Sequence, residues 1–150
     1  MSIARMLAKK FNLCGQTDLD HAKCDVIVDT LSDFQSAYRK KVYNGGMTAD
    51  KDAAKKFHAE DASKLLENVE KMVAMYGDGN GHSVGKTLTW ADLHVFDILG
   101  QGGWYSREEP MDKSLDKYLE KFPHITKVNK ACESHPKIAE YLKKRPQSQY

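Results

Sequence analysis

Three aspartates, Asp25, Asp29 and Asp33, recur every four residues. Residues four apart share one face of an α-helix, so these carboxylates predict an acidic stripe. Carboxylate oxygens bind hard divalent cations, and two such stripes that met at a two-fold axis could hold one. Ser32 interrupts the acidic run, however, and the sequence therefore predicts no metal site. The plain alternative is a solvated acidic surface supported by neighbouring Lys or Arg.

The histidines and cysteines lack the spacing of a metal or redox site. None of the six histidines forms an HxxxH or HExxH pair. The three cysteines, Cys14, Cys24 and Cys132, include no CxxC pair and leave one unpaired in any disulfide scheme. We therefore expect a reducing compartment, with the thiols acting as small core residues.

Residues 79–87, GNGHSVGKT, superficially match a phosphate-binding loop. That motif requires a glycine five residues before Gly85, and Asn80 stands there. It also requires a preceding strand, whereas the sequence here predicts the end of a helix. We expect Lys86 in an exposed turn and no phosphate site.

Composition excludes several classes of protein. At 150 residues and 41% hydrophobic, the chain can bury one ordinary core. Its net charge is +2, and acids alternate with bases, so no nucleic-acid partner is expected. No apolar run approaches the ~20 residues of a membrane span. The N-terminus lacks the apolar region of a signal peptide, and we expect a soluble cytoplasmic protein.

Helical spacing of apolar residues dominates the chain, and no segment alternates like a strand. The predicted helices cover 2–11, 17 or 18 to 43, 50–76, a segment from Thr89, 115–132 with a break or start at Pro123, and a segment from Pro136. Glycines predict the intervening loops, including an irregular stretch over 100–110. The fold class is therefore all-α, a bundle of about five to seven helices.

The helix that begins at Thr89 carries the most specific local signal. Thr89 and Asp92 have the spacing of a capping box, in which each side chain bonds the other's backbone amide. The next turns are apolar on nearly every side, as in a helix surrounded by others. We expect Asp92 to be buried and structural.

Several segments together resemble the glutathione transferase family, particularly its sigma class. A capping box that opens a buried helix is typical of the family's C-terminal domain. Residues 1–8, MSIARMLA, are similar to the SxAIARYLA helix that closes its thioredoxin-like domain, with Ser2 in place of Ala and Met6 in place of Tyr. Residues 24–31, CDVIVDTL, resemble the next helix of the sigma class, and residues 141–146, YLKKRP, match the last helix and tail. That class includes prostaglandin D synthases and S-crystallins.

The resemblance implies a domain division. Residues 1–11 correspond to the last helix of a thioredoxin-like domain, 12–17 to the interdomain linker and 18–150 to the C-terminal helical domain. The family's catalytic Tyr or Ser, and the Gln-Ser pair that holds glutathione, would precede Met1. We therefore expect no catalytic residue in this chain, and no conjugation by the chain alone.

The resemblance also implies binding residues, with glutathione as co-substrate. In sigma-class dimers, an aspartate at the position of Asp33 reaches across the two-fold axis to the amino group of glutathione. Gln35, Tyr38, His94 and Ile98 correspond to positions facing the hydrophobic electrophile, although plain packing explains each equally well. No metal is expected.

Two functions follow from the resemblance. The first is conjugation of glutathione to electrophiles or isomerisation of a prostaglandin endoperoxide, by a homodimer of the full-length protein. The alternative is a non-catalytic binding or scaffold module, as in the lens S-crystallins. Neither involves a nucleic acid or a membrane.

Overall fold

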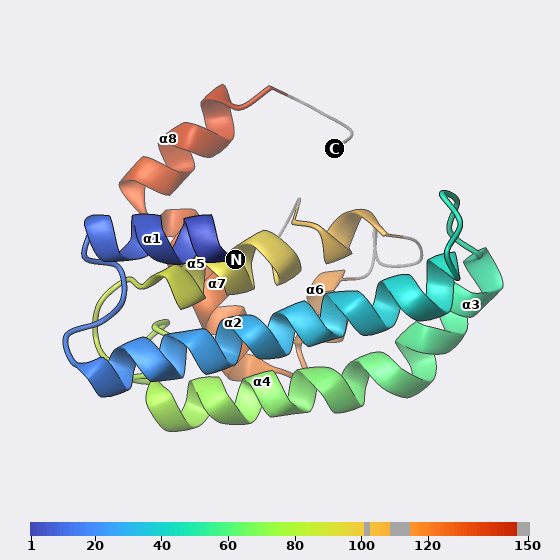
Figure 1. The fold of residues 1–150 in the computed structure, drawn as a ribbon, viewed down its shortest axis with the longest axis horizontal. Coiled ribbons are helices and arrows are strands. Elements are labelled where there is room, and N and C mark those ends of the chain that lie inside the picture. Colours follow the sequence, from blue (N-terminus) through green and yellow to red (C-terminus); the bar gives the residue numbers. More distant parts are fainter. Residues whose placement is uncertain (101–102, 109–114, 147–150) are drawn as a thin grey trace.

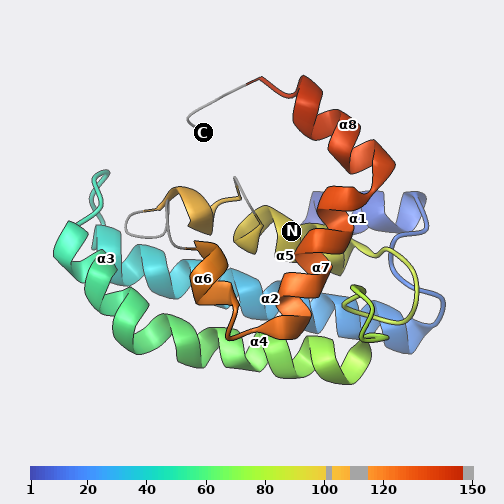
Figure 2. The ribbon, with the colours of Figure 1, turned by 180° about the vertical axis from the view of Figure 1, so that it is seen from behind.

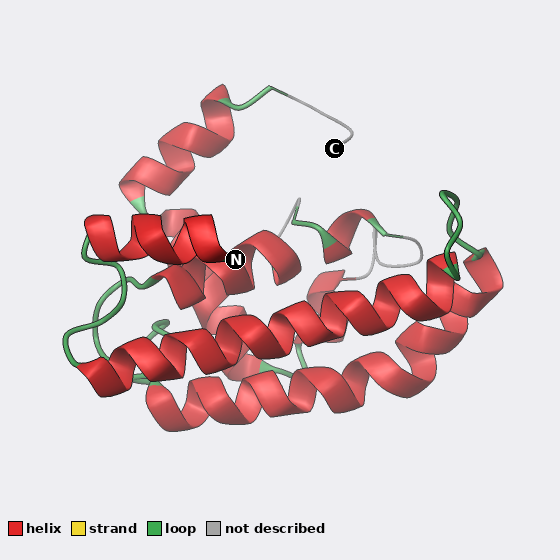
Figure 3. Cartoon of the chain, in the orientation of Figure 1, coloured by secondary structure: helices red, strands yellow, loops and turns green. Residues whose placement is uncertain are grey.

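The computed structural model describes residues 1–100, 103–108 and 115–146, and these form an all-α bundle (Figures 1 and 3). Its α-helices are α1 (Ser2–Lys10), α2 (Asp18–Tyr38), α3 (Lys51–Phe57), α4 (Ser63–Tyr76), α5 (Trp90–Leu99), α6 (Leu115–Leu119), α7 (Pro123–Ser134) and α8 (Pro136–Lys144). A π-helical turn, Arg39–Tyr43, extends α2, and another, His58–Ala62, joins α3 to α4. The described residues therefore contain seven continuous helical segments longer than one turn, which confirms the predicted fold class.

Local sequence signals account for most helix ends. Thr17, rather than Asp18, is the N-cap of α2 and forms a capping box with Asp20. The turn after α2 begins at Asn44, whose left-handed backbone (φ 43°) stops the helix. Pro123 occupies the first turn of α7, where its missing amide costs nothing. Of the predicted irregular stretch, residues 103–108 contain a short 3-10 helix (Tyr105–Arg107), and 101–102 and 109–110 lie outside the described residues.

Helices α2 and α4 lie side by side and antiparallel, and α5 and α7 pack against them (Figures 1 and 2). Helix α5 is central, as its apolar sequence predicts, and contacts α1, α2 and α7. Burying an apolar side chain contributes about 1.5–3 kcal/mol, so this core is the main source of stability. Its largest fully buried side chains are Tyr38, Tyr105, Phe34, Phe57, Ile27, Leu31, Leu66, Ile98, Leu99, Ile125 and Val28.

Helices α1 and α8 lie on the same side of the bundle, and α8 stands away from its body (Figures 1 and 2). Ile3 of α1 is 73% exposed, and Met6 and Phe11 are also exposed. No residue of α8 is buried, although the helix is amphipathic. These two helices therefore leave apolar surface uncovered. None of the described helices is long and apolar enough to cross a membrane.

Candidate functional site

Arg5 engages two of the three carboxylates in the acidic stripe of α2. Its Nε donates a hydrogen bond to Oδ1 of Asp25 at 2.9 Å, and its Nη2 lies 3.9 Å from Oδ1 of Asp29. The same guanidinium lies over the Trp90 ring, 5.6 Å from its centroid, and so ties α1 to both α2 and α5. Asp33, one turn further along, is exposed and has no hydrogen bond or ion pair within the described part of the chain. Asp33 is therefore the carboxylate of the stripe that can accept a cationic group.

The four residues predicted to face an electrophile do not line one common cavity among the described residues. Tyr38 and Ile98 are each 1% exposed and belong to the core. Gln35 is half-buried on α2. His94 lines a cavity between α1 and α5. The assignment of these four residues to one electrophile pocket remains a prediction.

The α1–α5 cavity has a volume of about 300 Å³ and an apolar wall that includes Leu7, Phe11, Trp90 and Leu93. The Nε2 atom of His94 is buried and has no hydrogen-bond partner among the described residues. Burial lowers the pKa of His94, since desolvation disfavours the imidazolium. A neutral imidazole beside this cavity could exchange a hydrogen bond with a bound polar group.

Asp92 is buried, and its contacts confirm its predicted place in a capping box. Its Oδ2 accepts hydrogen bonds from the Thr89 amide at 2.6 Å and from the Thr89 hydroxyl at 2.9 Å. Its other oxygen accepts from the amide of Ser83, which was not foreseen from the sequence. Asp92 therefore joins the start of α5 to the preceding loop. Burial raises its pKa, while these hydrogen bonds act in the opposite direction.

Glu108 forms a polar cluster that the sequence did not predict. Its carboxylate accepts hydrogen bonds from the hydroxyls of Tyr38 at 3.3 Å and Tyr43 at 3.2 Å. Burial, and secondarily this carboxylate, raises the pKa of both tyrosines. Both hydroxyl protons are thus held by Glu108, so neither tyrosine is set up to stabilise a thiolate. Partners 70 and 65 residues apart carry no sequence signal that could have paired them.

All three cysteines are free and buried. Desolvation raises the pKa of Cys24 to about 11 and that of Cys132 to about 12, and it also raises the pKa of Cys14. The thiolate is the reactive form, so these thiols are packing groups and not nucleophiles.

The predicted phosphate-loop mimic is structural. Helix α4 precedes it, and Lys86 is exposed. The loop is held by the Asp78 carboxylate near the His82 ring and by the Lys127 ammonium, which donates to the carbonyl of Gly79. These contacts fix the loop from which the Ser83 amide reaches Asp92.

Comparison with known sequences decides the family. The profile described as "Glutathione S-transferase, C-terminal domain" matches residues 32–145. The chain belongs to the glutathione S-transferase family. This match confirms the predicted resemblance to the family.

Individual relatives agree with this assignment. The chain is 31% identical to glutathione S-transferase 3 of Caenorhabditis elegans over 151 residues, which cover 99% of the chain and 69% of that relative. It is 28% identical to S-crystallin SL11 of Nototodarus sloanii, over 97% of the chain and 66% of that protein. A solved structure of a Fasciola hepatica sigma class transferase is 27% identical, with a TM-score of 0.75 over 100% of the chain and 67% of that structure. The chain thus spans about two thirds of the length of its relatives.

Proposed function

We propose that this chain is the C-terminal part of a sigma-like glutathione transferase that conjugates glutathione to hydrophobic electrophiles. Residues 1–11 would be the last helix of a thioredoxin-like domain, 12–17 the linker and 18–150 the helical domain. The exposed apolar face of α1 supports this division, since Ile3, Met6 and Phe11 need a partner surface. The raised tyrosine pKa values support a catalytic hydroxyl outside this chain.

In the proposed mechanism, a hydroxyl of the thioredoxin-like domain donates a hydrogen bond to the sulfur of glutathione and lowers its thiol pKa. The thiolate attacks the electrophilic carbon, a carbon–sulfur bond forms, and the leaving group departs with its electron pair. This chain would contribute Asp33, which reaches the glutathione ammonium of the partner subunit in a homodimer. The cavity beside His94 is a candidate site for the electrophile.

The observation that carries this proposal is the exposed carboxylate of Asp33, which has no partner in the described structure while Arg5 engages its two neighbours. The test uses the chain joined to the thioredoxin-like domain of a sigma-class relative. Asp33→Asn should raise KM for glutathione about five- to tenfold, because one charge-assisted hydrogen bond is lost. The KM for the electrophile should stay unchanged.

Asp29→Asn is the matched control, because Asp29 lies one turn earlier on the same stripe and is also exposed. If both substitutions raise KM equally, the effect is general electrostatic attraction and the role of Asp33 is refuted. The same joined protein should also be assayed for isomerisation of a prostaglandin endoperoxide, which is the related activity of the sigma class.

A non-catalytic scaffold is the second candidate, and the 28% identity to an S-crystallin favours it. It predicts a stable protein whose joined form conjugates no electrophile. Homodimerisation through α2 and a cytoplasmic location are part of both proposals.

A further inference from the structure

The chain contains two Asn-Gly pairs, and the structure holds them very differently. Asn44 and Gly45 lie in the turn after α2, whereas Asn80 and Gly81 lie in the loop between α4 and α5. In such a pair the glycine amide nitrogen can attack the side-chain carbonyl carbon of the asparagine, because glycine has no Cβ to obstruct the approach. The peptide that joins the two residues must rotate toward the side chain, so the freedom of the backbone decides which pair reacts.

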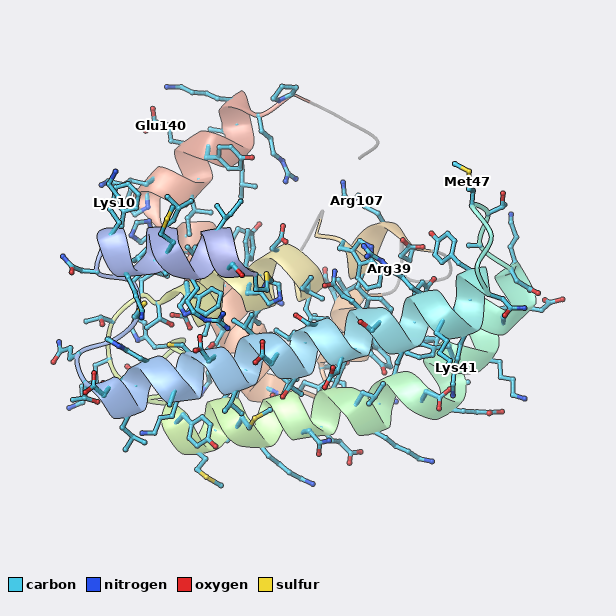
Figure 4. All side chains as sticks on the ribbon, viewed as in Figure 1. Lys10, Arg39, Lys41, Met47, Arg107 and Glu140 are labelled. Atoms are coloured by element: carbon cyan, nitrogen blue, oxygen red, sulfur yellow. The ribbon has the colours of Figure 1, made fainter. Side chains whose placement is uncertain are left out.

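The turn after α2 leaves its Asn-Gly pair unrestrained. Residues 44–48 are all exposed, and Met47 stands at the tip of the turn, away from the helices (Figure 4). The Gly46 amide donates to the Tyr43 carbonyl at 2.7 Å and so closes the base of the turn. The Gly45 amide, which would be the nucleophile, donates to no acceptor among the described residues. No atom beyond its chain neighbours lies within 4 Å of the position that a Cβ of Gly45 would take.

The starting conformation of Asn44 also favours rotation. Its backbone is left-handed, with φ 43° and ψ 41°, although it is not a glycine. Residues with a Cβ adopt this region less readily than the right-handed and extended regions. The conformation of Asn44 itself therefore offers little resistance to the rotation that the attack requires.

The loop that carries the second pair is fixed on both sides of it. The Asn80 amide donates to Oδ1 of Asp78 at 2.8 Å, and the Lys127 ammonium holds the preceding carbonyl at 2.9 Å. Gly81 is buried, and a Cβ there would lie 2.7 Å from the Ala131 side chain of α7. Rotation of this peptide has to disrupt these contacts, even though Asn80 is exposed like the asparagine of the first pair.

We propose that Asn44 is a site of spontaneous deamidation, with water as the co-reactant. The Gly45 nitrogen forms a bond to Cγ of Asn44 and gives up its proton, and the side-chain nitrogen leaves as ammonia, so that a succinimide ring closes. Water then opens the ring at either carbonyl and gives aspartate or, where the main-chain bond is cleaved, isoaspartate. Each product carries a carboxylate in place of the neutral amide, so the net charge falls by one, from +2 to +1. This modification does not depend on the proposed conjugation reaction.

The test incubates the folded chain at mildly alkaline pH and follows two tryptic peptides by mass spectrometry against a sample digested at the start. The peptide 42–51 contains Asn44 as its one asparagine, and the peptide 72–86 contains Asn80 as its one asparagine. Asn44 should convert at least about fivefold faster than Asn80, because local structure restrains the second pair. In urea, where neither pair is restrained, the two rates should agree within about twofold.

Gly45→Ala should slow the conversion of Asn44, because a Cβ obstructs the approach of the amide nitrogen. Gly79→Ala is the matched control, because Gly79 also has a left-handed φ (75°, against 80° for Gly45) and open space for a Cβ, and it should leave Asn44 unaffected. Equal rates at Asn44 and Asn80 in the folded chain, or no conversion of Asn44, would overturn the proposal. A difference that persists in urea, or an equal slowing in both variants, would overturn the structural cause.

Discussion

Replacing Asp92 should destabilise the protein more than any other single change to a charged residue of α5. The carboxylate accepts hydrogen bonds from the Ser83 amide, the Thr89 amide and the Thr89 hydroxyl, and it is buried. Hydrogen bonds to a charged group contribute about 1.5–3 kcal/mol each. In Asp92→Ala the buried donors of Ser83 and Thr89 would lose their acceptor, and each unsatisfied buried donor costs about 1–3 kcal/mol, so we expect the free energy of unfolding to fall by about 4 kcal/mol.

Urea denaturation followed by circular dichroism measures this loss. With a slope of about 2 kcal/mol per M urea, the midpoint should fall by about 2 M. Asp92→Asn keeps the shape and one acceptor oxygen, but it turns an amide group toward a donor, so about half the loss is expected. If Asp92→Ala does not fold, the urea midpoint of Asp92→Asn still measures the loss of stability.

Asp97→Asn is the control, because Asp97 is exposed on the same helix and should change stability by less than about 0.5 kcal/mol. If Asp92→Ala lay within about 1 kcal/mol of the parent, Asp92 would not be the structural anchor of α5.

Three further outcomes are expected. Burial lowers the pKa of His58, whose Nδ1 lies 3.0 Å from the Tyr105 hydroxyl, so the unfolded chain binds the proton more tightly than the folded chain. The free energy of unfolding should therefore fall as the pH drops from about 6.5 through the folded pKa. Urea titrations at several pH values measure this dependence, and His58→Gln should make it weaker. Hydrogen bonds from Thr17 and Gln16 lower the pKa of Asp20, so its carboxyl should titrate below the ordinary aspartate range by NMR, and Thr17→Ala should raise that pKa; an unchanged titration would contradict the capping box. Ile3→Lys adds a charge to the exposed face of α1 and should reduce self-association in sedimentation velocity without lowering stability, whereas a core role would show as a loss of stability.

Sequence patterns were sufficient for the helices and for one polar contact. Periodicity predicted the helical segments because each buries one apolar face, and the spacing of Thr89 and Asp92 predicted their pairing because it is local. The same logic fails at Val26, an apolar residue of α2 that is 45% exposed. A helix of 21 residues that contacts several neighbours need not bury one straight stripe.

Long-range polar contacts were not predictable in this way. Glu70 accepts hydrogen bonds from the backbone amides of His124 and Ile125, and so caps α7 from 54 residues away. The pairing of Arg5 with Asp25 likewise depends on how α1 lies across α2. Such contacts depend on how the helices pack together, and the spacing of residues along one helix does not contain that information. The sequence alone likewise could not show that Arg5 engages Asp25 and Asp29, and that Asp33 has no ion pair among the described residues.

The most direct test compares the conjugation rate of glutathione with 1-chloro-2,4-dinitrobenzene for this chain alone and for the chain joined to a sigma-class thioredoxin-like domain. We predict that the chain alone reacts only at the background rate. The hydroxyls of Tyr38 and Tyr43 donate to Glu108, and the thiols of Cys24 and Cys132 have raised pKa values. The joined protein should turn over well above background. Turnover by the chain alone, or a folded joined protein without activity, would contradict the proposal that this chain is the helical part of a glutathione transferase.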